Sequence, residues 1–414
     1  MKQTLSFAVL CLIGAIQAVS IHTDQAEQVG TEAYTEATRY IGADGKPVSL
    51  AQTEGHARLT MQRVQKYDTM QPLDIINLQT EACDAGNKTA DAGSLIQANS
   101  TQNQNTLVDD VTHCPINGNG PVEAHMKQIN LGDNAYVSEF YVGNPPQKLR
   151  GLFDTGSTNT WVLNKAVNLG QGVEKAFSYD DQASSSSKKL TQKAAIQFGS
   201  GALAGHFVTD DLRLGTCDGT TSSGQIHIKN QKFGNVEKQK TIFTGSNFEA
   251  IIGMAYPALA EKGVVPVFDE MINQKLLKTN VFAFYFTSKQ AESAGLNSDL
   301  TLGYYDKSKF KGDVQWHPVQ YKYMFGVKLD DVKVGGKALN MCEGKSEGCM
   351  ITFDSGTSLM SFPTWAAQKM MQNKLPTANF VVPCKSQADF GDMALVINGK
   401  DYVLSNEEWM FPSQ

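Results

Sequence analysis

The sequence predicts an all-β protein that is built from two related lobes. From about residue 135 onward, short runs of β-branched and aromatic residues alternate with turn residues, which is typical of antiparallel strands. The chain has 414 residues, more than a single compact core usually holds. The segment 152–158 (LFDTGST) also recurs as 352–358 (TFDSGTS), and this long offset fits duplication of a whole lobe better than a short-period solenoid.

The predicted strands and helices follow from local composition. The run 136–143 is the clearest strand, because the Asn144-Pro145-Pro146 turn ends it. Two segments, 267–273 and 365–373, are predicted to be helices. The other predicted strands are 194–198, 206–214, 281–287, 314–319, 327–334 and 394–404.

Composition and the N-terminus limit the cellular context. The formal net charge of −6 gives no electrostatic reason to expect a nucleic acid or an anionic membrane as partner. Residues 1–20 contain Lys2, a short apolar run and small residues at 18–20, which predict a signal peptide cleaved after about Ser20 rather than a buried helix. No later apolar stretch is long enough to span a bilayer. We therefore expect a soluble protein of the secretory pathway, where disulfides are permitted.

Residues 21–125 differ in composition from the remainder of the chain. The segment 59–67 has partial helical periodicity, whereas 82–107 is rich in small and polar residues and predicts a flexible linker. Asn87 and Asn99 lie in glycosylation sequons, which are equally consistent with unused chance matches.

The repeated motif places one carboxylate in each lobe, Asp154 and Asp354. Each follows an apolar strand and is followed by hydroxyl residues, a pattern that two chance matches would rarely produce. Two carboxylates that face each other cannot easily both ionise, so they share one proton and titrate as a pair. Such a pair can take a proton from a bound water and protonate a scissile carbonyl without a metal or a covalent intermediate.

The residues around the two aspartates have supporting roles in this hypothesis. We expect Thr155 and Ser355 to exchange hydroxyl hydrogen bonds between the two loops. Gly156 and Gly356 permit close backbone approach and offer N–H groups to the carboxylates. We expect the hydroxyls of Ser157 and Thr357 to donate hydrogen bonds to the outer carboxylate oxygens.

From about residue 125 to its end, the sequence resembles the pepsin family of aspartic proteases. The segments that carry the resemblance are 153–162 as the first active-site strand and loop, 180–187 with 196–201 as the approach to the flap and the flap, and 248–257 as the apolar element that supports the first loop. The resemblance implies a bilobal fold with a peptide-binding cleft, no cofactor and an aspartic endopeptidase made as a zymogen and active at acid pH. It assigns Phe198, Gly199 and Ser200 to the substrate-binding flap. It also implies a disulfide between Cys342 and Cys349.

These inferences divide the chain into four parts. They are a signal peptide (1–20), a propeptide with linker (21–125), an N-terminal catalytic lobe (126–305) and a C-terminal catalytic lobe (306–414). We expect protein or peptide substrates, a monomer, and an extracellular or lysosome-like acidic location.

The sequence departs from the family at three points. Phe198 stands where the flap usually carries a tyrosine that bonds the indole of the residue matching Trp161. The usual cysteine pair soon after Trp161 is absent. We also expect the second lobe to be truncated, because Asp154 precedes Gly253 by 99 positions, whereas the same step from Asp354 passes the last residue. Cys384 lacks the downstream cysteine expected as its partner.

Other classes of function fit the sequence less well. The glycines at 199–205 lie between predicted strands, so they favour a β-hairpin over a dinucleotide-binding loop. The seven histidines show no metal-ligand spacing, and no Gly-x-Ser-x-Gly elbow indicates a serine hydrolase. Two alternatives stay open: an inactive fragment, and a secreted binding or inhibitor protein that keeps the protease fold.

Overall fold

A computed structural model describes most of the chain after residue 120. The described residues are 121–410, apart from 168, 170–174, 199–200, 216–223, 241, 245, 346–347, 374 and 376–388, together with four short strands at 7–8, 19–22, 40–41 and 47–48. The predicted linker, both sequons and Cys83, Cys114, Cys217 and Cys384 lie outside the described residues.

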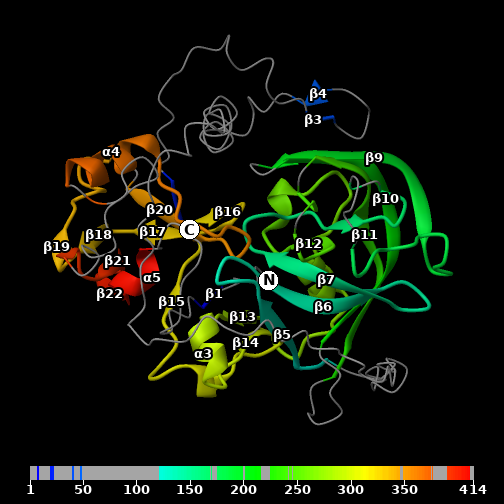
Figure 1. Cartoon of the computed structure of the whole chain (residues 1–414), viewed down its shortest axis with the longest axis horizontal. Helices are drawn as coiled ribbons and strands as arrows, with labels where there is room; N and C mark the ends of the chain where they lie inside the picture. Colours follow the sequence, from blue (N-terminus) through cyan, green and yellow to red (C-terminus); the bar gives the residue numbers. More distant parts are fainter. Residues whose placement is uncertain are drawn as a thin grey trace, which may run out of the picture.

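The largest element is a ten-stranded sheet, which forms the right-hand part of the molecule in Figure 1. Its strands, in spatial order, are β13 (Phe282–Tyr285), β14 (Ser298–Leu302), β5 (Ala124–Asn130), β6 (Tyr136–Val142), β7 (Gln147–Asp154), β12 (Ala250–Gly253), β8 (Trp161–Leu163), β11 (Ile226–Lys240), β10 (Gly201–Leu214) and β9 (Lys188–Phe198). Most neighbours are antiparallel, but β12 runs parallel to β7, and β11 runs parallel to β8. Two hydrophobic clusters pack against this sheet, one around Phe140, Phe153 and Phe233 and the other around Trp161 and Phe207.

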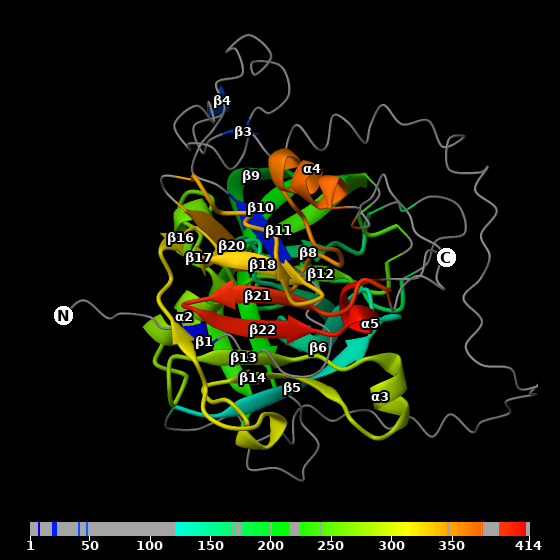
Figure 2. The same ribbon diagram turned by 90° about the vertical axis from the view of Figure 1, so that its left-hand side faces the viewer.

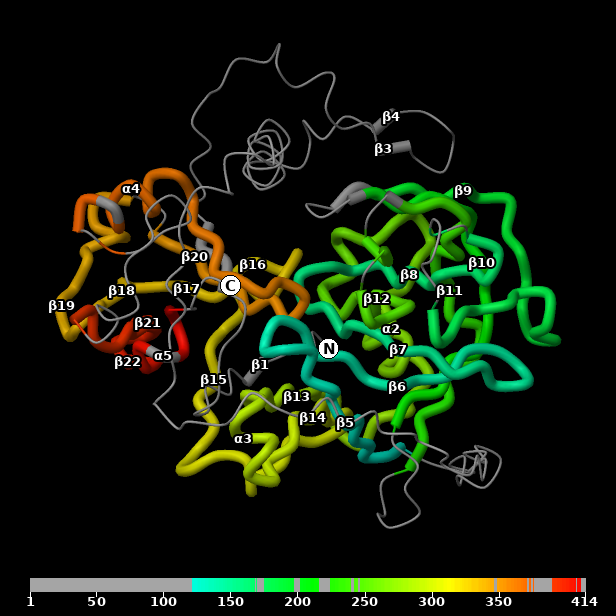
Figure 3. Tube along the Cα trace, viewed as in Figure 1, coloured from blue at the N-terminus to red at the C-terminus, as the bar shows by residue number. Residues whose placement is uncertain are grey.

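The C-terminal part contains two four-stranded sheets, which lie beside the large sheet in Figures 1 and 3. The first consists of β16 (Tyr321–Lys322), β17 (Phe325–Leu329), β20 (Cys349–Phe353) and β2 (Val19–His22). The second consists of β19 (Lys337–Ala338), β18 (Asp331–Val334), β21 (Met393–Ile397) and β22 (Lys400–Leu404), and its hairpin β21–β22 faces the viewer in Figure 2. A third hydrophobic cluster fills this part, with Leu329, Ile351 and Leu395 fully buried.

Short helices and two-stranded pairs complete the described structure. The α-helices are α2 (Val267–Asn273), α3 (Lys289–Ser293), α4 (Thr364–Gln372) and α5 (Asn406–Trp409), and the 3₁₀ turns are η5 (Pro257–Leu259) and η6 (Lys307–Lys309). The two small pairs are β1 (Phe7–Ala8) with β15 (Trp316–His317), and β3 (Tyr40–Ile41) with β4 (Pro47–Val48).

The predicted all-β class is confirmed. The helix predicted at 267–273 coincides with α2, whose N-cap is Pro266 and whose first turn carries Asp269 and Glu270, which favour a helix N-terminus. The predicted strand 327–334 is divided into β17 and β18, and the run 394–404 forms the antiparallel hairpin β21–β22. Asn398 and Gly399 form that hairpin's turn with positive φ, a conformation that asparagine and glycine adopt readily.

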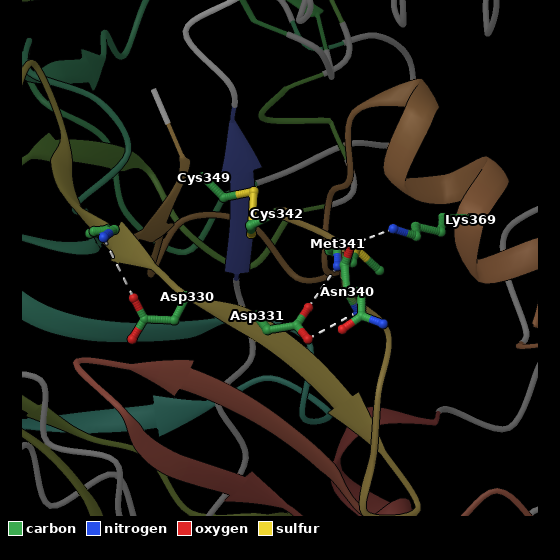
Figure 4. The surroundings of a disulfide bond; sticks show 8 residues. Asp330, Asp331, Asn340, Met341, Cys342, Cys349 and Lys369 are labelled. Atoms are coloured by element: carbon green, nitrogen blue, oxygen red, sulfur yellow. Dashed lines mark hydrogen bonds and ion pairs between the residues drawn. A yellow bond between two sulfur atoms is a disulfide. The ribbon is translucent and has the colours of Figure 1, made fainter. Parts of the chain in front are cut away.

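The disulfide between Cys342 and Cys349 is confirmed, and it closes a loop at the start of β20 (Figure 4). Its Cα atoms are 5.5 Å apart, within the usual range. The residues just before Cys342 are held as well, because the Asp331 carboxylate accepts the backbone N–H groups of Asn340 at 3.0 Å and Met341 at 2.7 Å. The loop therefore anchors the strand that ends at Phe353.

Replacing Cys342 and Cys349 together with alanine is expected to lower the free energy of unfolding by about 2.5 kcal/mol, because the short closed loop no longer restricts the unfolded chain. Equilibrium urea unfolding of the double variant and the wild type measures the difference. The control is the wild type under reducing conditions, which should show the same loss; equal stabilities of all three would contradict the prediction.

Candidate active site

Asp154 ends β7, which is buried between β6 and β12 in the large sheet. Gly253 of β12 is paired with Asp154, and the N–H of Met254 donates to the Asp154 carbonyl at 2.8 Å. A Cβ atom on Gly253 would lie 2.2 Å from the carbonyl carbon of Thr158, so only glycine fits where β12 passes the loop after Asp154. The segment 248–257 thus lies beneath the first loop, where the sequence predicted a supporting element.

Asp354 follows β20, the strand that begins at the disulfide. On its two edges β20 pairs with β17 and with the N-terminal strand β2, in which Val19 is opposite Phe353. β20, the strand that leads to Asp354, therefore has a paired strand along each of its edges.

The two loops exchange hydrogen bonds although they are about 200 positions apart in sequence. The Thr155 hydroxyl donates to the Phe353 carbonyl, and the Ser355 hydroxyl donates to the Phe153 carbonyl, both at 2.6 Å. In addition, the N–H of Thr155 donates to Ser355 Oγ at 3.0 Å, and the N–H of Ser355 donates to Thr155 Oγ1 at 2.9 Å. Sequence reasoning expected the hydroxyl exchange, but it did not anticipate the two carbonyl acceptors, because a backbone carbonyl leaves no signal in residue identity.

Each carboxylate is held by its own loop in the same way. Asp154 accepts the N–H of Gly156 at 2.8 Å and the hydroxyl of Ser157. Asp354 accepts the N–H of Gly356 at 2.9 Å and the hydroxyl of Thr357 at 2.7 Å. All of these donors were singled out from the sequence.

The two carboxyl groups face each other across the glycines. A Cβ atom on Gly156 would lie 2.3 Å from the Asp354 carboxyl carbon, and one on Gly356 would lie 2.3 Å from an Asp154 carboxyl oxygen. Each glycine therefore leaves the space that the opposite carboxyl group occupies.

The electrostatics of Asp154 follow from this placement. Its side chain is buried, and burial raises the pKa of Asp154 well above the usual aspartate value; the facing charge of Asp354 raises it further. The hydrogen bonds from Ser157 and Gly156 act in the opposite direction. The pair therefore retains a proton to higher pH than an isolated aspartate does.

Replacing Asp154 with asparagine is expected to stabilise the fold increasingly as pH rises. A carboxyl group whose pKa is raised on folding contributes its full stability below the unfolded-state pKa, and this contribution is lost as pH rises through the folded-state pKa. The neutral amide has no such loss. Melting temperatures of wild type and D154N, measured from pH 4 to pH 8, should diverge as pH rises. A difference in melting temperature that does not change with pH would contradict the raised pKa of Asp154.

The predicted flap segment is a β-hairpin. β9 and β10 are antiparallel and meet at the pair Phe198–Gly201, while Gly199 and Ser200 lie outside the described residues, as does the side chain of Phe198. Trp161 is fully buried, and its indole N–H has no hydrogen-bond partner among the residues that the structure describes.

Two negative findings concern only the described part of the chain. Within it, no cluster of three or more histidine, cysteine, aspartate or glutamate side chains is arranged to hold a metal ion. None of the helices described there is long and apolar enough to cross a bilayer.

Comparison with known proteins places this geometry in a family. A family model described as "Eukaryotic aspartyl protease" matches residues 135–414. The chain belongs to this family. It is an aspartic-type endopeptidase of the pepsin type, as the resemblance of the sequence implied.

Individual relatives of this aspartyl protease have similar identities. "Cathepsin D" of Bos taurus is 30% identical over 298 residues, covering 70% of this chain and 74% of that protein. "Cathepsin D" of Homo sapiens is 32% identical over 301 residues, covering 70% of each chain. "Gastricsin" of Callithrix jacchus is 31% identical over 286 residues, covering 66% of this chain and 70% of that protein.

Proposed function

We propose that this aspartyl protease hydrolyses peptide bonds in proteins with Asp154 and Asp354 as its catalytic pair. The observation that carries the proposal is the facing of the two carboxyl groups, each of which lies where a Cβ atom on the opposite glycine would clash. The raised pKa of Asp154 supports a pair that shares one proton. The four exchanged hydrogen bonds of Thr155 and Ser355 keep the loops at this separation.

The mechanism uses the shared proton and the one negative charge of the pair. The ionised carboxylate takes a proton from a bound water, whose oxygen forms a bond to the scissile carbonyl carbon. The protonated partner donates its proton to the carbonyl oxygen, which gives a neutral gem-diol. The carboxyl group that took the proton from water then donates it to the amide nitrogen as the C–N bond breaks. The other carboxylate takes a proton from one gem-diol hydroxyl as the C=O double bond re-forms, so the pair ends with one proton, as it began.

The biological setting is part of the same proposal. Residues 1–20 would direct the chain to the secretory pathway, 21–125 would be a propeptide, and the mature enzyme would act at acid pH in an extracellular or lysosome-like compartment. The predicted monomeric state stays a prediction, as do the catalytic lobe boundaries at 126–305 and 306–414.

An acid digestion assay tests the proposed function. The full chain, expressed through a secretory host and incubated at acid pH, should degrade denatured haemoglobin, and a statine inhibitor should abolish the degradation. Degradation that persists with the inhibitor would indicate a contaminating protease of another class. No degradation at any pH, with folding verified, would favour the alternative of a binding protein with the protease fold.

A change at the flap tests the assignment of Phe198. We propose that Phe198 covers the cleft through apolar contact alone, so Phe198→Tyr is expected to be tolerated, whereas Phe198→Ala should reduce kcat/KM about tenfold or more through loss of the apolar lid. Steady-state kinetics on a peptide substrate measure both variants. Equal kcat/KM for phenylalanine and alanine at this position would contradict the assignment of this segment as the flap.

A further inference from the structure

A buried ion pair lies at the start of the strand that supports the first catalytic loop. Arg150 Nη2 is 2.7 Å from Glu249 Oε1, and Arg150 Nε donates to Glu249 Oε2 at 3.3 Å. The Glu249 side chain is fully buried, and that of Arg150 is 21% exposed. The guanidinium group also lies 5.3 Å from the ring centre of Phe177. This pair is thus a two-point contact that is largely shielded from water.

The same two residues are joined through their backbones. The N–H of Arg150 donates to Glu249 Oε2 at 3.1 Å, and the N–H of Glu249 donates to the Arg150 carbonyl at 2.9 Å. On the other side, the Glu249 carbonyl accepts the N–H of Leu163 at 2.9 Å. Glu249 therefore fixes β7 and β8 relative to the beginning of β12.

A second cation holds the chain just before Glu249. Lys175 Nζ donates to the carbonyl of Ser246, to the Ser246 hydroxyl at 3.1 Å and to the Phe248 carbonyl at 3.3 Å. Burial lowers the pKa of Lys175, while the nearby charge of Glu249 raises it. The approach to β12 is thus fixed by side chains from two separate segments.

The position of the ion pair relates it directly to Asp154. Arg150 and Glu249 precede a parallel ladder that pairs Gly151 with Ala250 and ends by pairing Asp154 with Gly253. A shift of Glu249 along β7 would carry Gly253 and Met254 with it, and these residues contact the loop that follows Asp154. The contact between Arg150 and Glu249 at one end of this β7–β12 ladder therefore helps to set the position of Asp154 at the other end.

We propose that Arg150 and Glu249 are positioning residues for Asp154 and that they act through β12. This inference rests on the proposed catalytic role of Asp154. It goes beyond that role because it assigns a function to a charged pair that does not touch the reacting carboxylates. The contact is directional: an apolar pair of the same volume can fill the space, but it cannot accept the N–H of Arg150 or fix the two side chains at two points.

Two variants separate positioning from simple folding stability. Glu249→Gln keeps the shape and removes the charge. The double variant R150M/E249L replaces the pair with apolar side chains of similar volume, an exchange that often leaves stability unchanged for a buried ion pair. Asp401→Asn is the matched control, since it removes one partner of the exposed pair in which Lys333 Nζ lies 2.8 Å from Asp401.

The kinetic experiment uses the full acid-incubated chain and a fluorogenic peptide. E249Q and R150M/E249L should each lower kcat about 10- to 100-fold, with KM within about twofold, because misplacement of a reacting group by about 1 Å costs up to about 10²-fold. The melting temperature of R150M/E249L should fall less than that of E249Q, because the double variant leaves no guanidinium without its partner, and D401N should match the wild type in kcat. A double variant with wild-type kcat, or a raised KM at unchanged kcat, would overturn the inference.

Hydrogen exchange does not depend on enzymatic activity, so it tests the positioning role separately from the proposed proteolytic function. Hydrogen exchange of peptides that cover 250–256 should be about tenfold faster in E249Q than in the wild type, while peptides from β21 should not change. If the wild-type chain hydrolyses nothing, the proposed function fails and the exchange experiment still tests the positioning. Unchanged exchange at 250–256 in E249Q would overturn the positioning itself.

Discussion

Replacing Asp154 or Asp354 with asparagine is expected to reduce peptide hydrolysis at least about 10³-fold, because the reaction needs both the shared proton and the one ionised carboxylate. An asparagine at either position keeps the hydrogen bonds from the loop N–H groups, but it removes a group that can exchange a proton. Each single variant should lose nearly all activity. The double variant should be little worse than either single one, since the pair acts as a unit.

The measurement is kcat/KM on a peptide substrate for D154N, D354N and the double variant, with folding checked by circular dichroism. Asp269→Asn is the matched control. Burial raises the pKa of Asp269 to about 6, so it is also a shielded carboxyl group, but it lies in α2 rather than in either catalytic loop. We expect D269N to retain activity. Turnover by D154N or D354N at a tenth of the wild-type rate would remove the catalytic assignment.

The sequence predicted those parts of this site that depend on residue identity. The two Asp-(Thr/Ser)-Gly motifs specified the carboxylates, the hydroxyls that cross between the loops and the glycines whose N–H groups donate to the carboxylates. Each of these roles requires a particular residue type: a carboxylate, a hydroxyl, or a glycine with no side chain. Such requirements are visible in the sequence itself. The helix α2 was predictable for the same reason, since Pro266 precedes a short run that combines an acidic first turn with apolar residues on one face.

The parts that sequence reasoning missed depend on distant pairing. β11 was not among the predicted strands although it has 15 residues, because lysine, glutamine and asparagine dominate its sequence. Its buried apolar side chains, among them Ile228, Phe233 and Val236, are separated by polar residues and do not stand out as an apolar run. The pairing of Arg150 with Glu249 was equally invisible, because the two residues are 99 positions apart in sequence and only the parallel register of β7 and β12 brings them together.

The space between the two carboxyl groups gives the second large expected effect. Replacing Gly156 with alanine would put a methyl group 2.3 Å from the Asp354 carboxyl carbon, less than any non-bonded contact allows. That carboxyl group is held by the Gly356 N–H and the Thr357 hydroxyl, so it cannot move aside without breaking both hydrogen bonds. The added methyl group must therefore separate the two aspartates.

We expect Gly156→Ala to lower kcat at least about 10²-fold, because a displacement of about 1 Å at the reacting groups has an effect of this size. Gly356→Ala should behave in the same way, since its methyl group would meet Asp154. The control is Gly312→Ala, where nothing lies within 4 Å of the added atom and the positive φ costs only about 1 kcal/mol of backbone strain. Kinetics on a peptide substrate, together with melting temperatures, compare the three variants. If G156A kept more than a tenth of the wild-type kcat while remaining folded, the two carboxyl groups could not be as close as the structure places them, and the shared-proton mechanism would lose its geometric basis.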